Sequence, residues 1–275
     1  MKLKELLIKL EGIAPFELAE SWDNVGLLIG DPGQKVDGLL IALDPTEEIL
    51  AEALSRKLNV IITHHPFIFR PLKAIRTDQN TGRFLKLALG HDIAVVGIHT
   101  NLDVIQGGVN DVLAGQLGIF SAGPIHATGE MTGGDEEIGF GRTGPLESPV
   151  SGREFLDRIL DVLGLPLVRV AGRIPDIVTE AAVCGGSGSD LAEKAMQLGA
   201  QIYITGEVKH NVARWAEEAG FCVVDAGHYA TENLVVNALA GLIEKQLSSS
   251  FADIPVRTTA NQTNPFHYFG GEKAL

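Results

Sequence analysis

The chain contains 275 residues, 45% of them hydrophobic and 21% charged, which is enough to bury one large core or two smaller ones. Its 35 acidic and 22 basic residues give a net charge of −13 without any run rich in Lys and Arg, which argues against a surface for nucleic acid. No segment approaches the roughly 18 consecutive apolar residues of a membrane span, so we expect a folded cytoplasmic protein without a membrane partner.

Helices and strands alternate along the first half of the chain. Residues 1–10 place lysines among leucines, which is typical of an amphipathic helix rather than a signal peptide. Residues 44–48 have the features of a helix start: an N-cap candidate, a Pro in the first turn and acidic residues at the positive end of the helix dipole. We expect helices over 1–10, 44–57, 81–89 and 110–117, and strands that end near residues 29, 43, 62 and 98. The alternation predicts parallel strands joined by right-handed crossovers.

Between residues 121 and 149 the composition changes to Gly, Pro and acidic residues, which indicates either a change of domain or an exposed hairpin. The alternation then resumes. We expect helices over 151–163, 190–198 and 211–219, a long helix that begins within 225–232 and runs to about 246, strands over 167–171, 181–184, 202–205 and 221–224, an edge strand at 254–257 and a closing turn at 264–266. The fold class is therefore α/β: two three-layer units, one formed by 1–124 with 226–275 and the other by 125–225.

The two cysteines, Cys184 and Cys222, each lie within an apolar run, and the sequence contains no Cys-x-x-Cys spacing. We expect them to be buried reduced thiols rather than a disulfide or metal ligands.

Two adjacent histidines, His64 and His65, follow the apolar run 60–62. This β-branched run suits a strand that is buried on both faces, and Pro66 prevents the strand from continuing. Ligands of open α/β sheets bind just beyond the carboxyl ends of the strands. Because neighbouring strand residues point to opposite faces, the two imidazoles can be directed at different points there.

Two further strand ends supply similar side chains, His99 with Asp103 and His228 with Glu232. The second pair is four residues apart at the start of a helix, so both side chains lie on one helix face. Imidazole and carboxylate ligands without thiolate favour Zn, Mn, Fe, Co or Ni. Five or six such ligands exceed the needs of one tetrahedral zinc and fit two divalent ions bridged by a carboxylate, whose residual positive charge would attract an anionic substrate group.

Each of these residues has an ordinary explanation when it is considered alone. Adjacent histidines also occur by chance, Asp103 could cap a helix, and Glu232 could be a solvated helix residue. A single histidine is more often structural or solvated than a ligand, and we expect this of His91, His126 and His267. The predicted metal site therefore depends on the combination at three strand ends.

Five segments, in this order along the chain, resemble the NIF-three-like family, whose members are also known as GTP cyclohydrolase I type 2 homologues. They are SWDNVGL at 21–27, THHP at 63–66, HTNLD at 99–103, ITGEVKH at 204–210 and GHYATE at 227–232. The resemblance spans nearly the whole chain, and it implies a NIF-three-like fold with a dinuclear metal cleft and a toroidal homo-hexamer. Longer members carry an inserted domain in mid-chain, which is absent at this length.

The resemblance also implies a ligand set. His64, Asp103 and Glu232 would hold one ion, whereas His65, His228 and the bridging Glu232 would hold the other. His99 falls near the site, where the resemblance gives it a supporting role, because the family pattern does not make it a firm ligand.

Two more stretches fit the same pocket. Residues 185–190 join a strand to a helix, and backbone N–H groups at Gly186 and Ser187 could hold a phosphate, although the stretch could equally be a tight glycine turn. In the segment after residue 205, Glu207 or His210 could move a proton for a metal-bound water, and Lys209 could meet an anion.

Exposed charges at strand ends are common, so these individual roles are weaker predictions than the metal ligands. Trp22, Asp23 and Asn24 could instead shape the junction between the two units, and the sequence assigns them no role.

Together these features predict a metal-dependent hydrolase in which a metal-bridging hydroxide attacks a phosphorylated or heterocyclic substrate. GTP ring opening is the label that the family carries, and nothing else in the sequence selects guanine. The alternative is a protein without catalytic activity, such as an oligomeric metal store, a metal-delivery factor or a regulatory scaffold.

Overall fold

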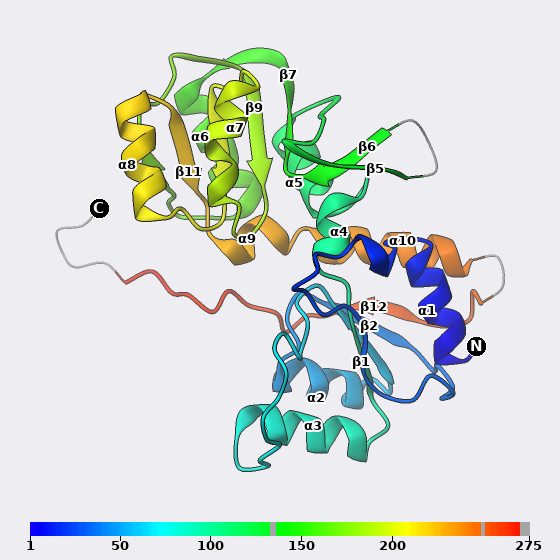
Figure 1. The fold of residues 1–275 in the computed structure, drawn as a ribbon. Coiled ribbons are helices and arrows are strands. Elements are labelled where there is room, and N and C mark those ends of the chain that lie inside the picture. Colours follow the sequence, from blue (N-terminus) through cyan, green and yellow to red (C-terminus); the bar gives the residue numbers. More distant parts are fainter. Residues whose placement is uncertain (133–135, 249–250, 270–275) are drawn as a thin grey trace.

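The computed structural model describes residues 1–132, 136–248 and 251–269, and these residues form two five-stranded sheets and a two-stranded hairpin (Figure 1). The first sheet has the order β1-β4-β3-β2-β12. Its strands are β1 (Gly26–Ile29), β2 (Leu39–Ala42), β3 (Val60–Thr63), β4 (Ala94–Gly97) and β12 (Val256–Thr258). Strands β12, β2, β3 and β4 are parallel and β1 is antiparallel to β4, so the predicted parallel core and the late edge strand are both confirmed.

Helices cover both faces of this sheet because successive strand residues point to opposite sides. On one face, Leu39 and Ile41 pack with α1 (Leu3–Glu11) and α10 (Val235–Leu247). On the other face, Leu40 and Ile61 pack with α2 (Glu47–Ser55) and α3 (Asn80–Gly90). Figure 1 shows the two pairs of helices on opposite sides of the strands.

The second sheet has the order β7-β9-β10-β11-β8. Its strands are β7 (Arg142–Ser151), β8 (Arg169–Ala171), β9 (Ile177–Cys184), β10 (Ile202–Thr205) and β11 (Cys222–Asp225). The three central strands are parallel, whereas the edge strands β7 and β8 are antiparallel. Helices α5 (Val109–Leu117) and α6 (Gly152–Leu163) pack on one face, and α7 (Ala192–Gln197) and α8 (His210–Ala219) pack on the other.

The predicted fold class, two three-layer α/β units, is therefore confirmed. The division of the chain at residues 124/125 and 225/226 stays a prediction. The core of the second sheet also includes Leu113 and Leu117 of α5, which the predicted division assigns to the first unit. Cys184 and Cys222 are buried free thiols, as predicted. Among the described residues, no helix is long and apolar enough to cross a membrane.

Two local predictions are wrong, and a third is incomplete. The Gly- and Pro-rich stretch 121–149 contains a hairpin, one of the two predicted alternatives, formed by β5 (His126–Thr132) and β6 (Glu136–Phe140), but it also begins the long strand β7. Strand β7 tolerates Pro because it is an edge strand, and its register with β9 is interrupted between Pro145 and Val150. The helix expected from residue 44 begins at Glu47, since Thr46 is the N-cap and Pro45 precedes it.

The long helix expected from 225–232 to 246 is instead divided into α9 (His228–Glu232) and α10, with two residues between them. Three short helices complete the chain: η1 (Phe16–Leu18), α4 (Thr100–Val104) and η2 (Ser189–Leu191). Helices α4 and α9 lie between the two sheets (Figure 1), so each carries its side chains to the boundary of both units.

Candidate metal centre

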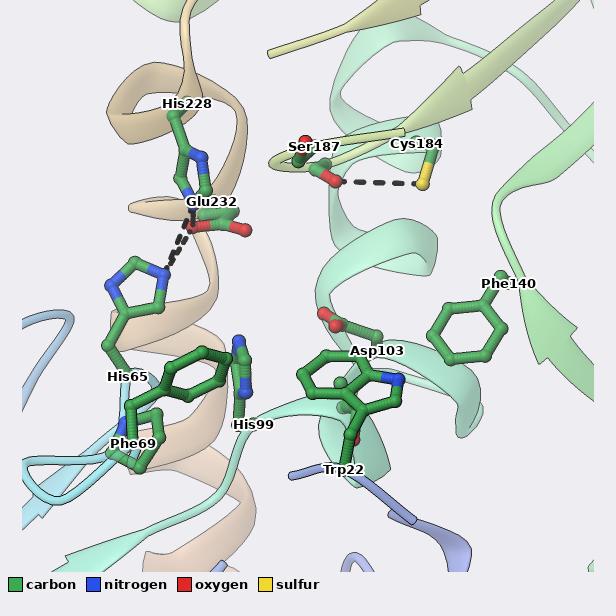
Figure 2. A pocket seen from close by; sticks show the side chains of 13 residues that line it. Trp22, His65, Phe69, His99, Asp103, Phe140, Cys184, Ser187, His228 and Glu232 are labelled. Atoms are coloured by element: carbon green, nitrogen blue, oxygen red, sulfur yellow. Dashed lines mark hydrogen bonds and ion pairs between the residues drawn. The ribbon is translucent and has the colours of Figure 1, made fainter. Parts of the chain in front are cut away.

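A cavity of about 460 Å³ lies between the two sheets and collects the side chains expected at the strand ends. Its walls come from the segments that follow β3, β4 and β9, from α9, and from the loop before β1 (Figure 2). The lining residues are Trp22, His65, Pro66, Phe69, His99, Thr100, Asp103, Phe140, Cys184, Gly185, Ser187, His228 and Glu232.

His64 lies immediately behind this wall and is completely buried. Its Nε2 atom is 3.7 Å from Oδ1 of Asp103 and 3.7 Å from Oε1 of Glu232. Both distances exceed a hydrogen bond. His64 and the two carboxylates therefore surround a common point without bonding to one another.

His65 and His228 approach the other oxygen of the same carboxylate. Oε2 of Glu232 is 3.1 Å from Nε2 of His65 and 2.9 Å from Nε2 of His228, and the two nitrogens are 3.2 Å apart. Figure 2 shows both rings directed at this carboxylate. Glu232 thus lies between His64 and Asp103 on one side and the two other histidines on the second side.

Every histidine of the site is fixed through its Nδ1 atom. Nδ1 of His64 is 3.1 Å from the carbonyl oxygen of Ile98, Nδ1 of His65 is 2.7 Å from Oδ1 of Asp44, and Nδ1 of His228 is 3.0 Å from Oε1 of Glu207. Since these oxygens accept, each Nδ1 carries a proton, and each Nε2 faces the cluster. This is the arrangement in which histidines bind metals, where an outer partner fixes the tautomer and the ring orientation.

His99 follows the same rule with a buried partner. Its Nδ1 atom is 2.9 Å from Oδ1 of Asp23, whose side chain is completely buried. Asp23 also accepts hydrogen bonds from the backbone N–H and the hydroxyl of Thr100. Burial opposes ionisation, but the hydrogen bonds from His99 and Thr100 outweigh it and hold the pKa of Asp23 well below its usual range.

Ligand atoms of His64, His65 and His99 lie within 4.8 Å of one another, and so do those of His65, His228 and Glu232. The structure therefore brings His99 closer to the cluster than a purely supporting role requires. It also brings together all five residues that the resemblance assigns to the metal ions, since Asp103 contacts the cluster through His64.

The cluster has abnormal proton affinities when no ion is bound. Burial disfavours the charged form of His65, but the carboxylates of Asp44 and Glu232 outweigh it and raise its pKa to about 10. Burial raises the pKa of Asp103 to about 7 against the opposing charge of His64. Burial also opposes the ionised form of Glu232, yet the surrounding imidazoles hold the pKa of this carboxyl well below its usual range.

In the described part of the chain, the buried Nε2 atom of His64 makes no hydrogen bond, and Oε2 of Glu232 has one only where His65 or His228 carries a proton on Nε2. An unsatisfied buried polar atom costs about 1–3 kcal/mol. Imidazole nitrogens and carboxylate oxygens that converge in this way fit a divalent ion of the zinc or manganese type. The residues present therefore fit the metal ions that the sequence predicts.

The glycine segment after β9 packs against the bridging carboxylate. A Cβ atom on Gly186, whose φ is +61°, would lie 2.0 Å from Oε1 of Glu232. The N–H groups of Gly185, Gly186 and Gly188 already donate to side chains of this protein, namely Asn110, Thr231 and Thr205. Gly186 therefore has no N–H to offer the predicted phosphate, and its observed role is to leave room for Glu232. Ser187 lines the cavity, as expected for a substrate contact.

The three charged residues after β10 have separate positions. Glu207 contacts Nδ1 of His228 and so supports a proposed ligand. Lys209 forms an ion pair with Asp190 at 2.6 Å, and His210 begins α8 as an exposed residue. Neither Lys209 nor His210 is among the described residues that line the cavity, so the structure gives no support to their predicted contact with substrate.

Several residues of the site were not identified from the sequence. Trp22, Asp23 and Asn24 line and support the cavity: Trp22 forms part of its wall, Asp23 fixes His99, and Asn24 donates to the carbonyl oxygen of Ile68 at 2.5 Å. Asp44 follows β2 directly, at the same sheet edge as the histidines. Its position after a strand could have identified Asp44 as a residue of the site. It was instead interpreted as part of a helix start, because the residues that follow it also suit one.

Buried Arg142 was also missed. Its guanidinium forms an ion pair with Asp111 and holds the end of α4, next to Asp103, against the strands β6 and β7. The carbonyl groups that accept its hydrogen bonds belong to Val104, Ile105, Gly139 and Gly141. No motif marks such a residue, because the partners that tie it to α4 and α5, namely Val104, Ile105 and Asp111, are distant in sequence.

One side of the cavity is aromatic. Trp22 is 57% exposed and Phe69 is 42% exposed, although both are large apolar side chains. Their rings meet edge to face with centroids 5.8 Å apart and an interplanar angle of 70°. Figure 2 shows them with Phe140 and His99 around the mouth of the site, where their faces are available to a flat ligand.

Comparisons with known proteins agree with this architecture. The family model described as Duf34/NIF3 (NGG1p interacting factor 3) matches residues 1–265. A Clostridium perfringens protein named "GTP cyclohydrolase 1 type 2 homolog" is 34% identical over 98% of this chain and 100% of its own length, and a Lactococcus lactis protein of the same name is 34% identical over 97% and 99%. The crystal structure of a Bacillus cereus protein related to NIF3 superposes with a TM-score of 0.91 at 25% identity, covering 98% of this chain and 99% of that one. A Staphylococcus aureus protein of known structure gives a TM-score of 0.90 at 30% identity with the same coverage.

Proposed function

Given that this chain belongs to the Duf34/NIF3 family, we propose that it binds two divalent metal ions and uses them to hydrolyse a phosphorylated or heterocyclic substrate. The observation that carries the proposal is the buried Nε2 atom of His64, which makes no hydrogen bond and lies 3.7 Å from the carboxylates of both Asp103 and Glu232, beside an open cavity. A fold that lacked a ligand here would have to tolerate this unsatisfied group.

The proposed ligand sets follow the two sides of Glu232. His64, Asp103 and Glu232 would hold one ion, and His65, His228 and Glu232 would hold the other. When bound, a pair of divalent ions supplies Lewis-acid activation of water and of a substrate oxygen.

The chain's own residues orient this chemistry. Asp44, Glu207 and the carbonyl oxygen of Ile98 hold the three proposed histidine ligands in one tautomer. Asp23 does the same for His99, and it leaves Nε2 of His99 free to exchange a proton with a molecule in the cavity. We therefore propose His99 in place of His210 as the proton carrier, with Glu207 acting through His228.

The cavity wall also restricts the substrate. Trp22, Phe69 and Phe140 offer apolar ring faces, which favours a flat ring system such as a heterocyclic base. No Lys or Arg is present among the described residues that line the cavity. An anionic group of the substrate would therefore depend on the charge of the bound ions, which links substrate binding to metal content.

The test is a substrate panel of GTP, other nucleotides, phosphoesters and cyclic amides, run on protein loaded in turn with Mn, Zn, Fe, Co or Ni. We expect turnover of at least one substrate, its loss on chelation, and a loss of at least about 100-fold in a Glu232→Gln variant that remains folded. The matched control is Glu217→Gln, which changes an exposed helix residue in the same way.

Metal-loaded protein that turns over nothing in the panel would contradict the hydrolase and support the alternative, a metal store, delivery factor or scaffold. Well under one ion per chain after loading, or unchanged metal content in a His64→Ala/His65→Ala variant, would contradict both functions.

A further inference from the structure

The C-terminal segment after β12 reaches the metal centre through one side chain, Gln262. Its Oε1 atom accepts hydrogen bonds from the backbone N–H groups of Leu43 at 2.8 Å and Asp44 at 3.1 Å. Its Nε2 atom donates to Oδ2 of Asp44 at 2.8 Å. The amide of Gln262 therefore fixes both the backbone and the carboxylate of Asp44.

Asp44 uses its other oxygen, Oδ1, to contact Nδ1 of His65 at 2.7 Å. A continuous chain of hydrogen bonds therefore runs from Gln262 through Asp44 to His65, whose Nε2 atom faces Glu232 at 3.1 Å. Outer partners of this kind set the orientation and basicity of a histidine ligand, and their removal typically weakens metal binding by roughly 10- to 100-fold.

The segment is held in place by a second carboxylate, which is remote from the histidines. Glu52 on α2 is buried and accepts hydrogen bonds from the hydroxyl of Thr259 at 2.5 Å, the N–H of Ala260 at 3.3 Å and the amide of Asn261 at 3.1 Å. Residues 259–262 are therefore anchored at Glu52 and deliver Gln262 to Asp44.

The same segment also borders His228. Tyr229, which follows His228 in α9, donates from its hydroxyl to the carbonyl oxygen of Gln262 at 3.2 Å. Farther along, a second cavity of about 460 Å³ is lined by Glu207 and His228 together with four residues of the tail, Asn264, Phe266, His267 and Tyr268. Figure 1 shows the tail passing from the first sheet below α9 toward the second unit.

These contacts support some of the proposed metal ligands and not others. The C-terminal segment supports His65 directly and adjoins His228, whereas His64 is fixed by the carbonyl oxygen of Ile98 and Asp103 is carried by α4. We infer that Gln262 is a positioning residue that acts through Asp44 and governs one ion site, His65–His228–Glu232, but not the other. This inference rests on the proposed two-ion centre.

An isosteric substitution tests it without opening a cavity. Gln262→Glu keeps an oxygen for the two backbone N–H groups but replaces the donor to Asp44 with a second oxygen, which repels the carboxylate. The matched control is Gln197→Glu, because it makes the same amide-to-carboxylate change beside another carboxylate, Glu193, on an exposed helix outside the C-terminal segment. Both variants are titrated with zinc in competition with a chromophoric chelator.

In Gln262→Glu we expect one of the two zinc affinities to fall by roughly 10- to 100-fold and the other to stay within about threefold. Gln197→Glu should leave both affinities near those of the unmodified protein. In an Asp44→Asn background, Gln262→Glu should cause no further loss. Unchanged affinities in Gln262→Glu, an equal fall at both sites, or the same loss in Gln197→Glu would overturn the inference.

A second readout does not need metal. In metal-free protein, long-range ¹⁵N correlation spectra of the imidazoles should show an altered Nδ1 environment for His65 in Gln262→Glu and no change for His64. If the unmodified protein binds no zinc, the proposed function fails, but these spectra still decide whether Gln262 sets the state of His65. An unchanged His65 signal would refute the coupling.

Discussion

The proposed metal ligands hold protons when no ion is bound. The pKa of His65 is raised to about 10 and that of Asp103 to about 7. At pH 7, His65 therefore carries a second proton, and Asp103 exchanges its proton in the neutral range. Metal ligands must lose these protons before they bind.

We therefore expect zinc binding to release protons and its apparent affinity to rise between pH 6 and 8, by about tenfold per pH unit for each proton released. Isothermal titrations in two buffers with different ionisation enthalpies give the number of protons. A His267→Ala variant is the control, since this exposed residue lies outside the cluster. Binding without proton release would contradict the proton affinities of the site.

The same shifts predict how the stability of the metal-free chain depends on pH. A group whose pKa is raised by folding stabilises the protein below its unfolded pKa, and this contribution is lost as the pH rises through the folded value. The window is about 3.8 to 7 for Asp103 and about 6.5 to 10 for His65. We expect the Tm of metal-free protein to fall from pH 6 to 9 and that of zinc-loaded protein to change much less. A rise of the metal-free Tm over this range would be the contrary result.

Trp22 carries a separate prediction, because its exposed ring touches the cavity and no proposed ligand depends on it. In a Trp22→Ala variant we expect unchanged zinc content and stability within about 0.5 kcal/mol. Loss of ring stacking, worth about 1–3 kcal/mol per base, should weaken binding of GTP by roughly 5- to 150-fold. Isothermal titration with GTP measures the affinity of both the unmodified protein and the variant. An equal GTP affinity with and without Trp22 would show that the aromatic wall does not contribute to binding.

At the scale of elements, short segments carry the ligands and larger segments constrain them. Asp103 lies on the five-residue helix α4, and His228 and Glu232 are the two ends of the five-residue helix α9. Such helices have little stability of their own. Their positions depend on tertiary contacts, including the buried guanidinium of Arg142 at the end of α4 and the glycine segment after β9 beside α9.

Gly186 provides the test at this scale. In Gly186→Ala, the new Cβ would collide with Oε1 of Glu232, so we expect the variant to lose at least one bound zinc per chain. Gly220→Ala is the matched control, because Gly220 has nearly the same φ, +66°, but open space around its Cβ position. Both variants should bear the strain of a left-handed backbone, of order 1–3 kcal/mol, which thermal unfolding measures. Equal zinc content in the two variants would show that Gly186 does not constrain Glu232.

The predicted elements agree best with the structure where the pattern is local. The buried strands β3, β4, β10 and β11 are marked by continuous apolar runs, and α6 by its periodic apolar face. Strand β7 was missed because its Gly and Pro residues suggest a loop, and only its pairing with β9 at the sheet edge makes a strand possible.

At the scale of the whole molecule, the cavity exists because two sheets direct their loops at one another. The first sheet contributes His65, His99 and Asp103 to its wall, and the second contributes Ser187 and the turn into α9. Ligands in open α/β sheets bind beyond the carboxyl ends of the strands, and here this edge of each sheet faces the other. Under the predicted division of the chain, all five proposed ligands belong to the first unit, and the second unit supplies the facing part of the wall at Cys184, Gly185 and Ser187.

The toroidal hexamer implied by the resemblance remains a prediction. Sedimentation velocity at micromolar concentration should give a single species of about 176 kDa, six times the chain mass of 29.3 kDa. The measurement is made with and without zinc, so that assembly and metal content are separated. A monomer of 29.3 kDa under both conditions would contradict the prediction.

The sequence by itself determined the α/β class, the parallel strands of both sheets and the strand ends where histidines and carboxylates gather. Apolar runs and ligand types are local properties, so they can be read from neighbouring residues. Only the tertiary structure decided that Asp23, Asp44 and Glu207 hold the imidazole rings, that Gly186 makes room for Glu232, and that Gln262 reaches the centre. These contacts join residues that are distant in sequence through hydrogen bonds and steric fit. Many different residues can make such contacts, so no sequence pattern marks them.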